Sequence, residues 1–113
     1  MERYGDINIL GTWYQVINQT EEENPKIFDK DGMCEPYAKK IVIDTSSKTD
    51  KDAVENIDDY FHAVLRHECF HAIFHEIGHG ADYCRDEVLV DLLALLYPKI
   101  KKIMDAADNR KID

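Results

Sequence analysis

Four histidines recur every four residues in the segment LRHECFHAIFHEIGHGADYC: His67, His71, His75 and His79. Residues i and i+4 of an α-helix lie about 6 Å apart along its axis and point in similar directions. Apolar residues accompany the histidines at helical spacing, at positions 57, 61, 64, 65, 69, 70, 73, 74 and 77. The segment therefore predicts an amphipathic helix that presents a row of imidazoles.

The same periodicity sets the expected limits of this first helix. It begins after Thr49, where Asp50 and Asp52 can cap its first turn and suit the helix dipole. Gly78 and Gly80 predict its end, because glycine commonly terminates helices.

A second helix follows. Its apolar positions are Val88, Leu89, Leu92, Leu93, Leu96, Ile100 and Ile103. Pro98 lies inside this pattern and is expected either to kink the helix or to divide it. The polar residues from 105 to 113 predict a frayed tail.

The first half of the chain has the composition of strands. Residues 7–17 are rich in β-branched and aromatic types and predict one strand, bent at Gly11. Pro25 is expected to open a short helix. Residues 33–45 predict a second extended region.

Length and charge limit the classes of function. A chain of 113 residues suits a single domain, residues 1–113. The formal net charge of −9 argues against nucleic acid or an anionic membrane as the partner. No apolar run approaches the ~18 residues that span a bilayer, and the N-terminus lacks a signal-peptide pattern, so we expect a cytoplasmic protein. Three cysteines without a C-x-x-C pair make a disulfide framework unexpected.

The segment contains two copies of H-E-x-x-H, at 67–71 and 75–79. In this motif the two histidines can bind one Zn²⁺, and the intervening glutamate can act on water as a general base. The first copy assigns His67 and His71 as ligands and Glu68 as the base.

A catalytic zinc also needs a third protein ligand, and the second helix offers Glu87 and, on the same helical face, Asp91. Glu87 can be the third ligand, and Asp91 can accept a hydrogen bond from a ligand histidine, His67 being favoured. A first-turn position would explain Glu87 without a metal. It does not explain Asp91, which lies among apolar residues of a helix expected to be largely buried.

The second copy fits a metal less well. Only eight residues separate His79 from Glu87, which leaves little room for a reversal and a returning helix. The longer separation of His71 and Glu87 allows two more helical turns before the reversal. We therefore assign the metal to the first copy, and expect His75 to be a partly exposed helix residue and His79 a helix-end residue.

The constellation H-E-x-x-H followed by E-x-x-x-D resembles the gluzincin class of zinc peptidases. The segments LRHECFHAIF, EVLVDLLALLYPKI and DGMCEPYAKKIVID also resemble a group of small zinc metallopeptidases of phages and mobile elements. The resemblance implies a minimal zincin-like α+β domain. A small antiparallel or mixed sheet would pack on the active-site helix and on a following helix that carries the third ligand. In zincins a strand edge beside the active-site helix binds the peptide, and KKIVID is the candidate for that edge.

These observations predict a zinc-dependent metallopeptidase that acts on a peptide or protein, with zinc-bound water activated by Glu68. Four residues are candidate donors to the oxyanion: Tyr83, His79, Tyr37 and Tyr97. The alternative is a non-catalytic, zinc-stapled interaction or assembly module of a phage or mobile element. A fourth protein ligand from Asp86, Cys84 or His75 would favour that alternative. The oligomeric state does not follow from the sequence.

Overall fold

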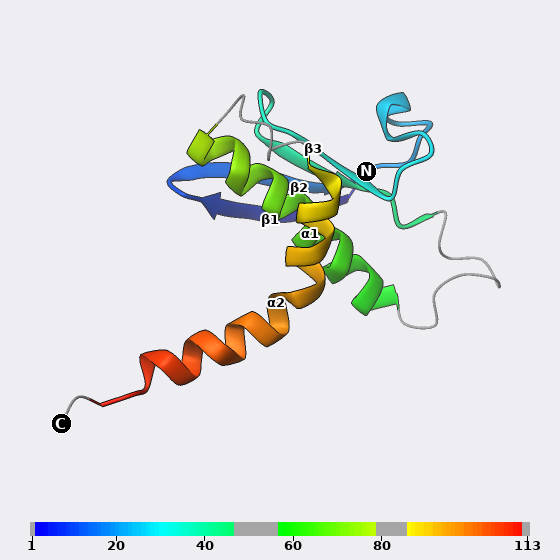
Figure 1. Cartoon of the computed structure of the whole chain (residues 1–113). Coiled ribbons are helices and arrows are strands. Elements are labelled where there is room, and N and C mark those ends of the chain that lie inside the picture. The colour runs from blue at the N-terminus through cyan, green and yellow to red at the C-terminus, as the bar shows by residue number, and fades with distance from the viewer. Residues whose placement is uncertain (1, 47–56, 79–85, 112–113) are drawn as a thin grey trace.

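The computed structural model describes residues 2–46, 57–78 and 86–111, which form an α+β fold (Figure 1). The elements are β1 (Glu2–Ile9), β2 (Thr12–Asn18), η1 (Pro25–Ile27), β3 (Gly32–Glu35), β4 (Lys40–Ile43), α1 (Ile57–Gly78) and α2 (Glu87–Asp108). The strands form one mixed sheet in the order β1-β2-β4-β3. Its β2–β4 pair is parallel, and its other two pairs are antiparallel. The predicted α+β class is confirmed.

A hairpin replaces the single strand predicted at residues 7–17. β1 and β2 pair antiparallel around a tight turn in which Leu10 (φ 53°) and Gly11 (φ 94°) both have positive φ. Two-residue turns of this kind match the right-handed twist of the flanking strands. Asn8 supports the turn, because its Oδ1 accepts the Gly11 N–H at 2.7 Å. The prediction of a bend at Gly11 was therefore wrong, and the chain reverses there.

The predicted extended region 33–45 is likewise two strands. β3 and β4 pair antiparallel around a turn in which Lys39 has a φ of 56°. The short helix predicted at Pro25 is confirmed as η1, whose Asn24 side chain accepts the Lys26 N–H.

The sheet buries apolar side chains on both faces. The face toward α1 contains Ile9, Tyr14, Val16, Ile41, Ile43 and the α1 residue Ala72. The opposite face contains Ile17, Ile27, Met33 and Val42, so η1 covers it. This alternation along β4 places residues 41 and 43 on one face and residue 42 on the other, as the period of a strand requires.

Helix α1 lies across the sheet, and its described part reaches Gly78, one of the two glycines predicted to end it (Figure 1). Asp58 and Asp59 occupy its first described turn, where acidic side chains suit the helix dipole. The expected caps, Asp50 and Asp52, lie outside the described residues.

Helix α2 packs against α1 through its first half and then extends away from the sheet (Figure 1). Its cap is Asp86, whose carboxylate accepts the Leu89 N–H at 2.9 Å. Pro98 does not divide the helix, which continues to Asp108, although a frayed tail was predicted from residue 105. The expectation that α2 is largely buried was wrong, since only Val90 and Ala94 are buried. No helix among the described residues has the length and apolar character to cross a membrane.

Candidate metal centre

Helices α1 and α2 bring three potential metal ligands to one point. His67 and His71 lie one turn apart on α1, and Glu87 is the first residue of α2. The Nε2 atoms of the two histidines are 3.2 Å apart. The Glu87 carboxylate lies 3.1 Å from Nε2 of His67 and 2.9 Å from Nε2 of His71. One donor atom from each residue falls within 4.8 Å of the others, which is compact enough for a single ion.

Asp91 lies one turn beyond Glu87 and contacts the other side of the His67 ring. Its Oδ1 is 2.7 Å from Nδ1 of His67. A proton on Nδ1 that is donated to this carboxylate leaves the Nε2 lone pair directed toward Glu87 and His71. The predicted partner of Asp91 therefore matches this geometry. Its predicted burial does not, because the Asp91 side chain is 71% exposed and that of Glu87 is 66% exposed.

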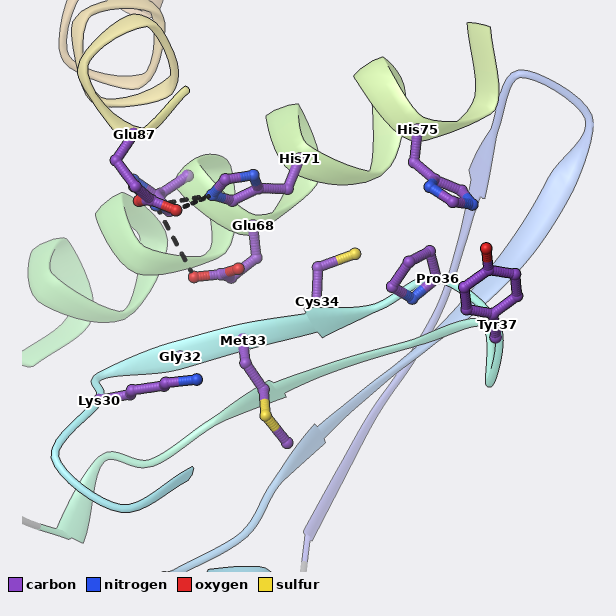
Figure 2. Close-up of a pocket in the computed structure, with 11 residues that line it drawn as sticks. Lys30, Gly32, Met33, Cys34, Pro36, Tyr37, Glu68, His71, His75 and Glu87 are labelled. Atoms are coloured by element: carbon purple, nitrogen blue, oxygen red, sulfur yellow. Dashed lines mark hydrogen bonds and ion pairs between the residues drawn. The ribbon is translucent and has the colours of Figure 1, made fainter. Parts of the chain in front are cut away.

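Glu68 occupies a different environment from its neighbours in sequence. Its side chain is buried between α1 and β3, and its Oε2 lies 4.0 Å from Nε2 of His67 (Figure 2). Burial raises the pKa of Glu68 from 4.5 to about 7, while His67 and His71 act in the opposite direction. Glu68 does not belong to the group of three donors. It is a buried carboxyl group beside the three donors.

Gly32, at the start of β3, allows this close approach. A Cβ atom at this position would lie 2.6 Å from Cγ1 of Val64 and 3.3 Å from Cγ of Glu68. It would also lie 3.2 Å from the backbone oxygen of Val42, so the strand could not take up a side chain without moving away from the helix. In the sequence the Asp31-Gly32 pair predicts a turn, and it gives no sign of this contact with α1.

A cavity of about 570 Å³ runs between α1 and β3 and contains the three donors. Its lining residues are Lys30, Gly32, Met33, Cys34, Pro36, Tyr37, His67, Glu68, His71, His75 and Glu87 (Figure 2). A second hollow of about 410 Å³ shares Gly32, His67 and Glu68 with it. His67 and Glu68 thus border both hollows.

The strand beside the site is not the one predicted. KKIVID was the expected edge, but β4 lies inside the sheet between β2 and β3. The strand that lines the cavity is β3, which pairs only with β4 among the described strands. The reason is the parallel pairing of β2 with β4, which covers one side of β4 and leaves β3 at the edge of the sheet.

The second H-E-x-x-H copy has a structural explanation within its described part. The Glu76 carboxylate accepts hydrogen bonds from the Tyr14 hydroxyl at 2.7 Å and from Lys39 Nζ at 3.0 Å. These bonds lower the pKa of Glu76 from 4.5 to about 2. Glu76 therefore ties α1 to β2 and to the β3–β4 turn. The His75 ring lies edge-on to the ring of Tyr37, with centroids 5.6 Å apart, and His79 lies outside the described residues.

The predicted oxyanion donors and the predicted fourth ligands lie partly near the cavity, partly away from it and partly outside the described residues. Tyr37 lines the cavity, whereas Tyr97, on α2, does not. Tyr83 and Cys84 lie outside the described residues. Asp86 caps α2 and His75 is not one of the grouped donors, so the described residues group three potential ligands and no fourth. Cys34 and Cys69 are free thiols, and burial raises their pKa values to about 12 and about 11.

No protein-family profile, curated protein or solved structure matches this chain.

Proposed function

We propose that this chain is a zinc-dependent metallopeptidase built on a minimal zincin-like domain. The observation that carries the proposal is the convergence of His67, His71 and Glu87 within 4.8 Å, beside a buried glutamate that is not one of the three. Two imidazoles and one carboxylate are a donor set that suits Zn²⁺ and leaves a position open for a reactant. A structural zinc site would require a fourth protein ligand.

Each residue of the site has a specific role in this proposal. His67, His71 and Glu87 would hold the ion, and Asp91 would orient His67 through the contact with its Nδ1. A bound Zn²⁺ would supply Lewis acidity, which acidifies water and polarises a carbonyl. Glu68 would accept the proton of the attacking water and transfer it to the nitrogen of the leaving amine.

The cavity supports a peptide as the substrate. β3 presents a strand edge along one wall, and an extended peptide could add to that edge through backbone hydrogen bonds. The second hollow, which His67 and Glu68 also line, gives the peptide further room beside the site.

The first test separates the base from the ligands. Glu68→Gln preserves the size of the side chain and removes the proton acceptor. The variant should retain about one zinc per chain by elemental analysis and lose the cleavage that the wild type shows against a peptide library read by mass spectrometry. Loss of zinc from Glu68→Gln would indicate that Glu68 is itself a ligand, and it would refute the proposed ligand set.

A matched pair of histidine variants tests the ligand set. His71→Ala should lose zinc, whereas His75→Ala, one turn further along α1, should retain it. If the wild type holds zinc and cleaves no peptide of a broad library, the peptidase proposal fails and the chain is better described as a zinc-stapled interaction module.

A further inference from the structure

The outer face of α2 carries large apolar side chains that the described fold does not bury. Val88, Leu92, Leu95 and Ile103 are 80%, 50%, 76% and 63% exposed. Their spacing places them along one side of the helix, opposite the buried Val90 and Ala94. We call these four residues the α2 stripe. Lys99 interrupts the stripe between Leu95 and Ile103. Scattered exposed apolar residues are ordinary, but a row of four on one side of a helix is typical of an interface.

The second half of α2 lacks packing partners within the described fold, which lowers the stability of this part of the helix in water. This half extends away from the sheet and α1 (Figure 1). Short helices are marginal in water and owe most of their stability to packing of an apolar face. A covering partner along the stripe would supply that packing.

The charges of α2 indicate which partner fits. The part before Pro98, with its cap, carries Asp86, Glu87 and Asp91 and no lysine or arginine. The part after Pro98 carries Lys99, Lys101 and Lys102, and nearer its end Asp105 and Asp108. Lys101 is neutralised within the helix, because its Nζ lies 2.8 Å from Asp105. Of the remaining charges in this part, Lys99 and Lys102 lie nearest Pro98 and Asp108 lies at the end of the helix. The charge therefore changes from negative before Pro98 to weakly positive after it.

A second copy of this chain satisfies both features when the two α2 helices run antiparallel. The centre of the stripe falls between Leu95 and Leu96, midway from Val88 to Ile103. Rotation about that point places Val88 of one copy beside Ile103 of the other. It also brings the basic half of each helix alongside the acidic half of its partner, which favours this orientation over the parallel one.

We propose that the α2 stripe is the surface through which two copies of this chain pair, with their α2 helices antiparallel. The pairing would cover Leu95 in both copies. It would also place Lys99 and Lys102 of one copy near Glu87 and Asp91 of the other, the two carboxylates of the metal centre that are most exposed. The proposal rests on α2 alone and does not depend on the peptidase activity.

Analytical ultracentrifugation of the full chain tests the pairing. The wild type should sediment with twice the 13.1 kDa mass of one chain at micromolar concentration. Leu95→Glu should weaken the dimer by at least about 30-fold, because a charge would be buried at the centre of the interface. The matched control is Leu10→Glu in the β1–β2 turn, where Leu10 is 62% exposed, and this variant should remain dimeric. Circular dichroism verifies that both variants are folded.

Orientation and charge are tested separately. Leu95→Cys should form an intermolecular disulfide on mild oxidation. In an antiparallel pair the two copies of residue 88 lie far apart, so the disulfide yield of Val88→Cys should not exceed that of the wild type. Lys99→Glu combined with Lys102→Glu should weaken pairing at low salt, with a smaller effect at high salt. A monomeric wild type, or a Leu95→Glu variant as dimeric as the Leu10→Glu control, overturns the proposal. Equal cross-linking of the two cysteine variants overturns the antiparallel arrangement.

Discussion

Replacement of Gly32 by alanine tests how closely β3 must approach α1 to form the site. The added Cβ would lie 2.6 Å from Cγ1 of Val64 and 3.2 Å from the backbone oxygen of Val42. Overpacking of this kind costs about 1–3 kcal/mol in a well-packed interior. The loss of glycine's freedom in the unfolded chain offsets about 0.4–1 kcal/mol of that cost.

We therefore expect Gly32→Ala to lower the free energy of unfolding by about 1–2 kcal/mol, measured by urea denaturation followed by circular dichroism. For a domain of this size the corresponding fall in melting temperature is about 4–8 °C. Zinc content should change little, because none of the three donors is on β3.

A double-mutant cycle identifies the cause. Val64→Ala removes the Cγ1 atom that the new methyl group would meet, so Gly32→Ala should cost less in that background than in the wild type. Part of the penalty should remain, because the backbone oxygen of Val42 cannot retreat as a side chain can. If Gly32→Ala is as stable as the wild type, or costs the same in both backgrounds, the reasoning about the contact between β3 and α1 is refuted.

Two further substitutions test the contacts around the site. Glu76→Gln should cost about 1–2 kcal/mol at pH 7, because Glu76 accepts hydrogen bonds from Tyr14 and Lys39 and the lysine is partly exposed. The Glu76 pKa is lowered from 4.5 to about 2, so its contribution is complete above pH 4.5 and is lost as the pH falls toward 2. Unfolding curves of wild type and variant should converge over that range, and a constant difference down to pH 2 would contradict the assignment. Asp91→Asn should reduce zinc affinity by about 10–100-fold in a chelator competition assay, and an unchanged affinity would mean that the contact with His67 does not tune the site.

Local patterns accounted for what the sequence could predict. The period of the apolar residues located both helices, because helical structure depends on neighbours three and four residues apart. The same spacing placed His67 and His71 on one face, and it placed Glu87 and Asp91 on another. When two helices pack, residues on the facing surfaces can contact only a few partners. The contact between Asp91 and His67 could therefore be predicted.

The sheet depended on contacts that no local pattern encodes. Leu10-Gly11 is not a strong turn signal, and the polar residues of β1 become a strand only because β2 pairs with them. The parallel pairing of β2 with β4 joins segments separated in sequence by η1 and β3, and it decides that β3 rather than β4 lines the cavity.

Burial also emerged only in three dimensions. Asp91 lies among apolar residues and looked buried, but α2 contacts the rest of the fold along one narrow face, and Asp91 lies beside that face. Glu68 and Glu76 occupy equivalent positions in the two H-E-x-x-H copies, yet one is buried beside the histidines and the other binds Tyr14 and Lys39. The sequence determined which residues share a helix face. Only the tertiary structure decided what each face meets, because that depends on the surfaces that the sheet and the other helix bring to it.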